Sequence, residues 1–280
     1  MPFFIPFALG GLALAALGLK RVLEDLASRP AFPEGSRARE AWERHQQALS
    51  ALRATRERVR DQARRYSERQ ERARLDTVEP FRALLARLER WEHASAAEVL
   101  TPVGHAALQA LPEGPAPRDT RYAWAMLGVG VPAPASLSTV LTWLEKGWLS
   151  EEGPPVVVAG VSLYSVASQG SAPGSADTAA QPLDAAREEL HRVVTFLEAL
   201  HTRLEALDAR VATLHGRAAA QLAYLDPQSF EEDPTEPRER LRRLGTLMSA
   251  LTEALRQPAL EPSGALAPLP EPLAEPPSAR

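Results

Sequence analysis

Histidine is the residue type in this sequence best suited to proton transfer or metal binding, because its imidazole titrates near neutral pH. Six histidines occur, at His45, His93, His105, His191, His201 and His215. No two are three or four residues apart, the spacing that places two imidazoles on one helix face around a shared metal ion. His191 closely follows Glu188 and Glu189, and a solvated helix surface explains that grouping. We therefore expect no metal site.

Motifs for other chemistry are missing or incomplete. The sequence contains no cysteine, which excludes disulfide bonds, thiolate nucleophiles and thiolate metal ligands. Ser162 and Ser165 lack the flanking glycines that expose the nucleophile of a hydrolase. Gly128 and Gly130 lack the third glycine and the preceding strand of a dinucleotide-binding loop. These observations predict a protein that is not an enzyme and has no catalytic residues, cofactor or small-molecule substrate.

The clearest pattern in the chain is an uninterrupted heptad repeat of apolar residues in a predicted helix. The repeat consists of Leu190, Val193, Leu197, Leu200, Leu204, Leu207, Val211 and Leu214. Their spacing alternates between three and four residues, so they form one stripe along a helix, and such a stripe packs against another helix. We expect these residues to be a helix-packing seam. The pattern does not decide whether the partner helix belongs to the same chain or to a second copy.

The composition favours helices throughout. Of the 280 residues, 45% are hydrophobic but only 6% are aromatic, and leucine and alanine supply most of the apolar side chains. The net charge of −4 gives no overall positive field that would attract nucleic acid. Arginine outnumbers lysine by 30 to 2, a bias that a GC-rich genome explains better than function. We expect an all-α protein, an elongated antiparallel helical bundle or coiled coil with an N-terminal apolar helix and a central apolar hairpin.

Residues 1–29 are predicted to form an N-terminal apolar anchor helix. Residues 1–19 contain no charged side chain, and residues 3–19 would span about 26 Å as a helix, close to the ~30 Å hydrocarbon core of a bilayer. Lys20 and Arg21 follow directly, as expected for side chains at the cytoplasmic membrane interface. Two alternatives stay open: a hydrophobic helix buried in the protein, and a signal peptide that is cleaved from the chain.

Residues 36–93 are predicted to form a charged helical arm, with one helix over residues 37–75 and a second over residues 79–91. The apolar stripe of the first helix is narrow and is interrupted by Arg56 and Gln70, as in a solvent-exposed coiled coil. The arm contains 15 arginines and 10 acidic residues, an excess that suits anionic lipid headgroups, an acidic partner or nucleic acid. Alternating acidic and basic residues also fit a solvated surface. Without clustered aromatic residues, we do not expect specific nucleic-acid recognition.

The middle of the chain is predicted to contain a loop at residues 94–121 and an apolar hairpin at residues 122–167. Aromatic residues stand at both ends of an uncharged stretch, about 19 residues apart, like the two interfacial belts of a membrane-spanning helix. The predicted membrane-interface residues are Lys20, Arg21, Tyr122, Trp124, Trp143 and Trp148. Pro132 and Pro134 argue against one straight helix, and the hairpin equally fits the core of a soluble bundle.

The last third of the chain is predicted to consist of a linker, two helices and a tail. Residues 168–181 are rich in small residues, which predicts a flexible linker. Residues 182–256 are predicted to form coiled-coil helices, first the helix with the seam and then a shorter leucine-rich helix from residue 237 onward. Residues 257–280 contain seven prolines and are predicted to be a disordered tail.

Three stretches carry a likeness to other proteins: residues 7–18, residues 137–143 and residues 241–255. In order and composition they resemble a family of uncharacterised bacterial helical, membrane-associated proteins with an apolar Gly/Ala-rich centre. The resemblance implies an apolar segment, a charged helix, an apolar centre, a coiled-coil helix and a leucine-rich helix. It implies no activity, because the family has none assigned to particular residues. The centre of this chain departs from the pattern, with Glu145 and Lys146 among the expected glycines and alanines.

These interpretations lead to a first functional hypothesis, a non-enzymatic membrane-associated helical scaffold or assembly protein. Its expected location is the bacterial inner membrane with the bulk of the chain facing the cytoplasm. Its expected partners are the lipid bilayer and, through coiled-coil pairing, a second copy of the chain. An alternative is an α-helical membrane-perturbing or pore-forming protein whose apolar hairpin inserts into the bilayer. A third hypothesis is a soluble coiled-coil adaptor, if residues 1–19 belong to a core.

Overall fold

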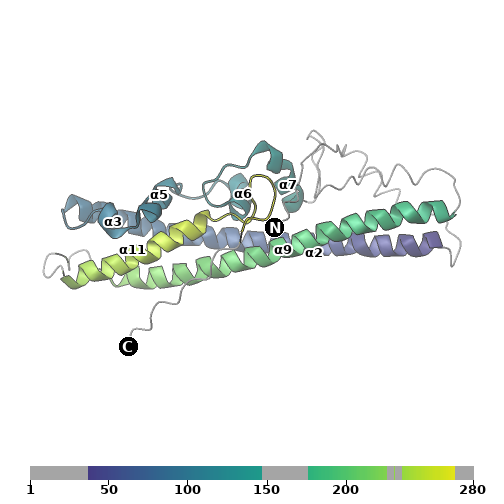
Figure 1. The fold of residues 1–280 in the computed structure, drawn as a ribbon. Helices are drawn as coiled ribbons and strands as arrows, with labels where there is room; N and C mark the ends of the chain where they lie inside the picture. Colours follow the sequence, from purple (N-terminus) through teal and green to yellow (C-terminus); the bar gives the residue numbers. More distant parts are fainter. Residues whose placement is uncertain (1–36, 147–175, 226–229, 231–234, 269–280) are drawn as a thin grey trace, which may run out of the picture. The chain divides into compact units, whose positions relative to one another are not determined.

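The computed structural model describes residues 37–146, 176–225, 230 and 235–268. Within these residues every regular element is a helix, and the one β-type contact is an isolated antiparallel bridge between Leu260 and Leu266 (Figure 1). The predicted all-α bundle is therefore confirmed. The expected apolar helix at residues 1–29 lies outside the described residues.

The chain divides into two compact units, and the division passes through both long helices. Unit 1 contains residues up to 61, residues 134–201 and residues 262–265, whereas unit 2 contains the other described residues. The chain therefore leaves unit 1 within α2 (Arg37–Ala73), returns to it after Ala133, and leaves it again within α9 (Ala176–Ala223). Each unit is described by itself below.

α9 carries the predicted seam and is the longest described helix, at 48 residues. All eight seam side chains are at most 3% exposed, so the stripe is buried within one chain. Residues 176–181 of the expected flexible linker are helical, and the helix begins six residues before Pro182. Alanine has the highest helix propensity and supplies three of these six residues, which explains the early start. Residues 168–175 lie outside the described part of the chain.

In unit 1, α9 runs in the same direction as α2. Two ion pairs between the helices show this direction. The first joins Arg44 and Asp184 at 3.1 Å. The second joins Arg58 and Glu198 at 3.6 Å, so the residue numbers of the partners increase by 14 on both helices. In an antiparallel pair, the residue numbers of the partners would increase on one helix and decrease on the other.

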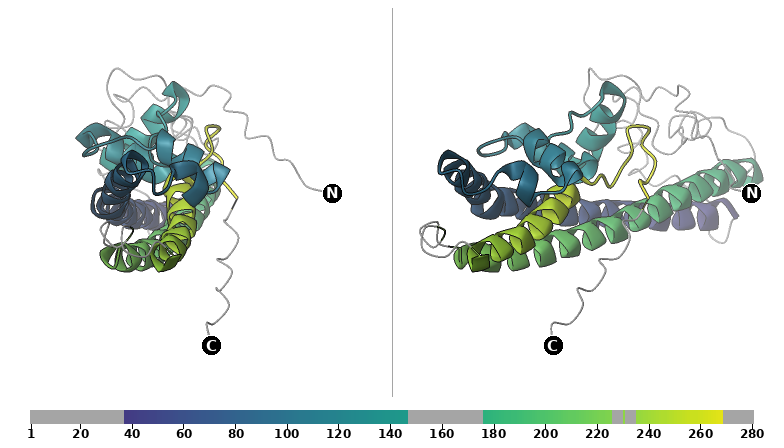
Figure 2. Two further views of the ribbon diagram at one scale, coloured as in Figure 1. Left: turned by 90° about the vertical axis from the view of Figure 1, so that its left-hand side faces the viewer. Right: turned by 60° about the vertical axis from the view of Figure 1, so that its left-hand side comes forward.

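Unit 2 shows the same direction. Arg69 pairs with Asp208, and seven residues further along both helices the charge of Asp76 acts on His215. The predicted antiparallel arrangement of the two long helices is therefore wrong. Short connections favour antiparallel neighbours, but about a hundred residues separate these helices, which is long enough for a crossover that returns the chain to its starting end. α11 (Thr235–Arg256) lies beside α9 after a short connection and runs back along it (Figures 1 and 2).

The expected loop at residues 94–121 contains helices in unit 2, separated by short non-helical connections. After the π-helix η1 (Arg74–Val78) and α3 (Glu79–Arg90), the chain forms α4 (Ala96–Val99), α5 (Pro102–Ala110) and α6 (Arg118–Leu127). Ser95 and Glu98 form a capping box at the start of α4. The hydroxyl of Thr101 accepts a hydrogen bond from the N–H of Gly104 at 3.0 Å and caps α5. The proline at the first position of α5 begins a helix there and does not mark a loop.

Small residues bring α4 and α5 close to α11. A Cβ atom on Gly104 would lie 2.2 Å from the Oγ of Ser249, and a Cβ on Gly245 would lie 2.1 Å from the carbonyl oxygen of Val99. The Oγ of Ser249 also accepts a hydrogen bond from the N–H of Thr101 at 3.2 Å. Any larger residue at either glycine would push the helices apart, so these positions fix how α5 lies on α11.

The ends of α6 and α11 cap each other. The N–H of Val129, just after α6, donates to the carbonyl of Leu255 at 2.9 Å, and the N–H of Ala259, just after α11, donates to the carbonyl of Met126 at 2.8 Å. Gly128 ends α6 with a φ of 94°, where its backbone touches that of Arg256. These bonds satisfy carbonyl groups that a helix end would otherwise leave unpaired.

The predicted disorder of the tail is wrong for residues 257–268. Ala259, Leu260 and Ala267 are buried, and the N–H of Ala267 donates to the carbonyl of Ala259 at 3.1 Å. The prolines here terminate α11 and shape a turn, which composition alone does not distinguish from disorder. Residues 269–280 lie outside the described residues.

The predicted apolar hairpin at residues 122–167 is divided between the two units. α6 belongs to unit 2, whereas α7 (Ala135–Lys146) belongs to unit 1, and the proline-containing segment between them is not helical. Leu137, Leu141 and Leu144 of α7 are buried within unit 1. Residues 147–167 lie outside the described residues. In the described part of the chain, no helix combines the length and apolar character needed to cross a bilayer.

Truncating a seam residue should test the structural importance of α9. Leu204→Ala removes a side chain that is fully buried, so we expect the free energy of unfolding to fall by about 2–5 kcal/mol. Urea denaturation followed by circular dichroism measures this change. The matched control Ala206→Ser alters an exposed residue of the same helix and should change stability by less than about 0.5 kcal/mol. Equal urea midpoints for the Leu204 variant and the unaltered protein would contradict the assignment.

Candidate functional site

The most unusual side chain of unit 2 is Arg74, a charged residue that is 1% exposed. Its Nη2 donates hydrogen bonds to the carbonyl oxygens of Pro112 at 2.7 Å and Gly114 at 2.6 Å. Its guanidinium also lies over the ring of Trp124, 5.2 Å from the ring centre. One arginine therefore joins three segments of the chain: the π-helix η1 that follows α2, the connection before α6, and α6 itself.

Arg74 is the first residue of the π-helix η1. The N–H of Glu79 donates to the carbonyl of Arg74, five residues earlier, instead of the usual four. The wider turn inserts an extra residue, and it turns Arg74, Thr77 and Val78 into the core. A regular helix would continue the apolar stripe of α2 past Ala73 without change, so the bulge accounts for the inward position of this arginine.

Two further arginines hold the same connection. Arg82 on α3 donates through Nη2 to the carbonyl oxygens of Leu108, at the end of α5, and Leu111. Arg121 on α6 donates to Glu71 at 2.7 Å, and the same carboxylate oxygen accepts the N–H of Ala116 at 3.3 Å. Together with Arg74 these contacts satisfy the backbone of a proline-rich connection that has few hydrogen bonds of its own.

Burial lowers the pKa of Arg74, while the nearby carboxylates of Glu79 and Glu71 act in the opposite direction. The guanidinium still stays charged at neutral pH because its ordinary pKa is so high. Its Nε and Nη1 have no hydrogen-bond partner among the described residues. A charged arginine is a hydrogen-bond donor only, so Arg74 positions the segments that it contacts. The sequence analysis did not predict this site, because the apolar spacing of α2 contains no signal for a π-helix.

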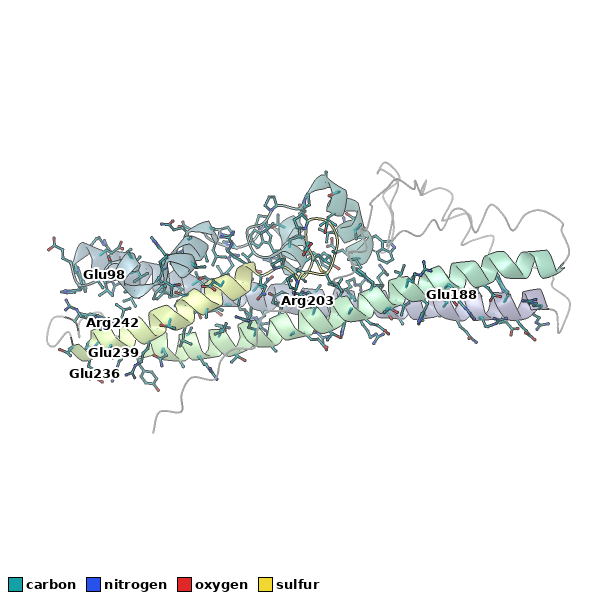
Figure 3. The ribbon with its side chains drawn as sticks, in the orientation of Figure 1. Glu98, Glu188, Arg203, Glu236, Glu239 and Arg242 are labelled. Atoms are coloured by element: carbon teal, nitrogen blue, oxygen red, sulfur yellow. The ribbon has the colours of Figure 1, made fainter. Side chains whose placement is uncertain are left out.

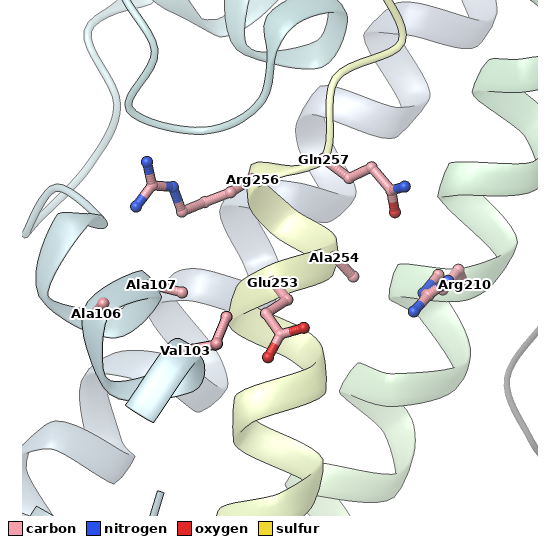
Figure 4. Close-up of a pocket in the computed structure, with 8 residues that line it drawn as sticks. All are labelled: Val103, Ala106, Ala107, Arg210, Glu253, Ala254, Arg256 and Gln257. Carbon is pink, nitrogen blue, oxygen red and sulfur yellow. The ribbon is translucent and has the colours of Figure 1, made fainter. Parts of the chain in front are cut away.

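An open groove lies on the surface of unit 2, with α5 and α11 as its walls and one residue of α9 at its edge (Figure 4). Its volume is about 530 Å³. The residues that line it are Val103, Ala106, Ala107, Arg210, Glu253, Ala254, Arg256 and Gln257. The close approach of α5 to α11 at Gly104 sets the width of the groove.

The groove combines an apolar floor with charged edges. Val103 is 64% exposed, and three alanines widen the apolar surface around it. Arg210 and Arg256 supply positive charge, and Glu253 supplies one negative charge. The lining includes no histidine, serine or threonine, and its one carboxylate is that of Glu253. Such a surface suits an extended ligand with apolar and acidic groups.

The structure separates the predicted membrane-interface residues. Tyr122 is buried in unit 2, and Trp124 stacks against Arg74, so both contribute to helix packing and not to an apolar outer surface. Trp143 is partly exposed in unit 1, where its carbonyl accepts a hydrogen bond from Arg56 at 3.3 Å. Lys20, Arg21 and Trp148 lie outside the described residues.

The histidines occupy separate places in the described chain. His45 is 4% exposed in α2, 6.2 Å from the ring of Trp42, and burial lowers its pKa. His93 stacks on Phe230 with ring centres 6.2 Å apart. Across the described residues, no three histidine, aspartate or glutamate side chains gather in a way that could hold a metal ion.

No protein-family model matches the chain, and neither the curated proteins nor the solved structures yield a match to it. This result is consistent with the resemblance to an uncharacterised family. The site residues must therefore be interpreted from their own geometry.

Removing the Arg74 side chain should loosen the connection that it holds. In Arg74→Leu the carbonyls of Pro112 and Gly114 lose a buried donor, which costs about 1–3 kcal/mol each where water does not replace it. We expect backbone hydrogen–deuterium exchange in residues 111–116 to accelerate about tenfold or more. Arg74→Lys should not restore slow exchange, because an ammonium cannot reproduce the planar guanidinium. Arg87→Leu, at an exposed position of α3, is the control; equal exchange in all variants would refute the role of Arg74.

The buried histidine should make stability depend on pH. The unfolded chain protonates His45 near its ordinary pKa of 6.5, whereas the folded chain does so only at lower pH. Between these values the unfolded state binds more protons, so stability should be complete above pH 6.5 and fall as the pH is lowered. Burial of His215 adds an effect of the same sign. Urea denaturation at several pH values should show a weaker pH dependence in His45→Leu. The exposed-site control His191→Leu should keep the original dependence, and an unchanged profile in His45→Leu would contradict this explanation.

Proposed function

We propose that this chain is a non-enzymatic helical scaffold or assembly protein that associates with the bacterial inner membrane. The observation that carries the proposal is the uninterrupted buried seam of α9, with every one of its eight residues at most 3% exposed. A helix of 48 residues whose seam is buried is the kind of element on which a scaffold protein is built.

The charged residues of unit 2 support a structural and binding role over a catalytic one. The three arginines around the proline-rich connection are used on backbone carbonyls and on a carboxylate. The groove presents mainly arginines and apolar side chains, which suit the binding of a ligand. On the exposed face of α11, Glu236, Glu239 and Arg242 project into solvent (Figure 3).

Membrane association rests on the N-terminal sequence. Residues 1–19 carry no charged side chain, and Lys20 and Arg21 follow as a cytoplasmic-side anchor would require. The bulk of the chain would then face the cytoplasm. Self-association remains part of the proposal, but a second copy would need a surface other than the α9 seam, since that seam is already buried within one chain.

The pore-forming alternative would require residues 122–167 to leave the protein core. In unit 2, that release would break the hydrogen bonds that Met126 and Val129 make with residues at and beyond the end of α11. It would also expose Ala125 and Met126, which are completely buried. The described contacts therefore favour a scaffold over a protein that inserts this segment.

Two charges placed in the N-terminal segment should abolish membrane association. Each arginine near the middle of a spanning helix costs about 2.5–3.5 kcal/mol. We expect the unaltered protein, expressed in bacteria, to stay in the membrane pellet after an alkaline carbonate wash. The variant Leu12→Arg/Leu14→Arg should move to the supernatant, whereas the control Gln109→Arg, at an exposed position of α5, should stay in the pellet.

Two outcomes would reject the proposal. Recovery of the unaltered protein in the carbonate supernatant would exclude an N-terminal anchor and favour a soluble adaptor. Release of a trapped dye from liposomes on addition of the protein would favour the pore-forming alternative, because a scaffold leaves the bilayer intact.

A further inference from the structure

Residues 257–268 bring the chain from the end of α11 back to α9. The bridge between Leu260 and Leu266 closes a turn at Gly264, whose φ is 86°. Beyond this turn, the carbonyl of Pro268 accepts a hydrogen bond from Nη2 of Arg203 on α9 (Figure 3). Arg203 is only 5% exposed, and its Nε has no hydrogen-bond partner among the described residues. Pro268 is therefore held on α9 by Arg203.

This contact is next to the groove. Arg203 and Arg210 are seven residues apart, a heptad step that places them on the same side of α9 about 10.5 Å apart. Arg210 is the α9 residue at the edge of the groove. α11 runs back along α9, so Gln257, Arg256 and Glu253 follow in the same direction as a chain that moves from Arg203 toward Arg210.

The sequence after Pro268 has the chemistry that the groove suits. Residues 269–280 contain four prolines, the carboxylates of Glu271 and Glu275, and the apolar side chains Leu269 and Leu273. Proline-rich sequences favour an extended helix that rises about 3.1 Å per residue and loses little entropy on binding. At that rise Glu271 is about 9 Å from Pro268, which matches the step from Arg203 to Arg210.

We infer that residues 269–280 bind in this groove of their own chain, with their carboxylates on Arg210 and Arg256 and Leu273 on the apolar floor. This inference goes beyond the proposed scaffold function and does not depend on it. Glu253 lies in the same lining and opposes an acidic ligand, whereas Arg256 and Arg210, which also interacts with another group of the chain, attract one. Partly exposed pairs of this kind are weak singly, and salt should screen them.

Distances between two spin labels on the full chain test the inference. The absence of native cysteine permits specific labelling of Ser278→Cys in the tail and Gln109→Cys on the exposed side of α5. A bound tail should give a narrow distance distribution at low salt. The distribution should broaden about twofold or more in about 0.5 M salt, in Arg210→Glu/Arg256→Glu, and in Glu271→Gln/Glu275→Gln.

The control variant is Arg217→Glu, an exposed residue one heptad beyond Arg210 and outside the groove lining. It should keep the narrow distribution, and circular dichroism should show that all variants are folded. A broad distribution in the unaltered full chain would overturn the inference and leave the groove to a partner segment. The inference would also be overturned if the distribution stayed narrow in the groove and tail variants, or if it broadened equally in Arg217→Glu.

Discussion

Burial of one apolar stripe on α9 is the constraint on which the rest of the fold depends. The stripe extends through both units, and in each unit α2 runs beside α9 in the same direction. Two successive helices can be parallel only if the chain between them returns to the end where the first began. The helices between α2 and α9 supply this return, and the chain accordingly changes units between Ala133 and Pro134. The parallel pairing of α2 and α9 therefore requires the short helices between them.

The returning segment packs apolar side chains such as Phe81, Leu88 and Met126 into the core, and two further kinds of contact hold it in place. Glycines at positions 104 and 245 let α5 and α4 approach the backbone of α11, which gains dispersion contacts where large side chains are absent. Buried guanidinium groups then satisfy the carbonyls that the proline-rich connection cannot pair internally. Close approach and buried charge together supplement this apolar packing. The groove is a consequence, because two helices that meet at a glycine diverge on either side of it.

Periodicity in the sequence predicted the parts of the fold that one helix determines by itself. The seam of α9, the extent of α2 and the leucine-rich α11 all follow from apolar residues at helical spacing. Helix direction did not follow, because a stripe is the same whichever way its partner runs. The helices at residues 94–121 did not follow, because proline and glycine are common in loops, whereas Pro102 begins α5 and Gly104 permits a close contact with α11. The packing of residues 257–268 did not follow, because a proline-rich composition also fits disorder. The groove and Arg74 depend on contacts between distant segments, which no local pattern contains.

The excess of arginine over lysine has a structural component beyond genome composition. Arg74, Arg82 and Arg203 are partly or fully buried, and each donates to backbone carbonyls of a proline-containing segment. A guanidinium is planar, weakly hydrated and charged at any physiological pH, so it can enter a core and serve two carbonyls at once. A lysine ammonium is a strongly hydrated point charge that tends to lose its proton on burial. The three positions therefore require arginine for physical reasons, and they lie where the chain returns to its long helices. At these three positions, the high arginine content of the chain has a structural role in addition to any mutational bias.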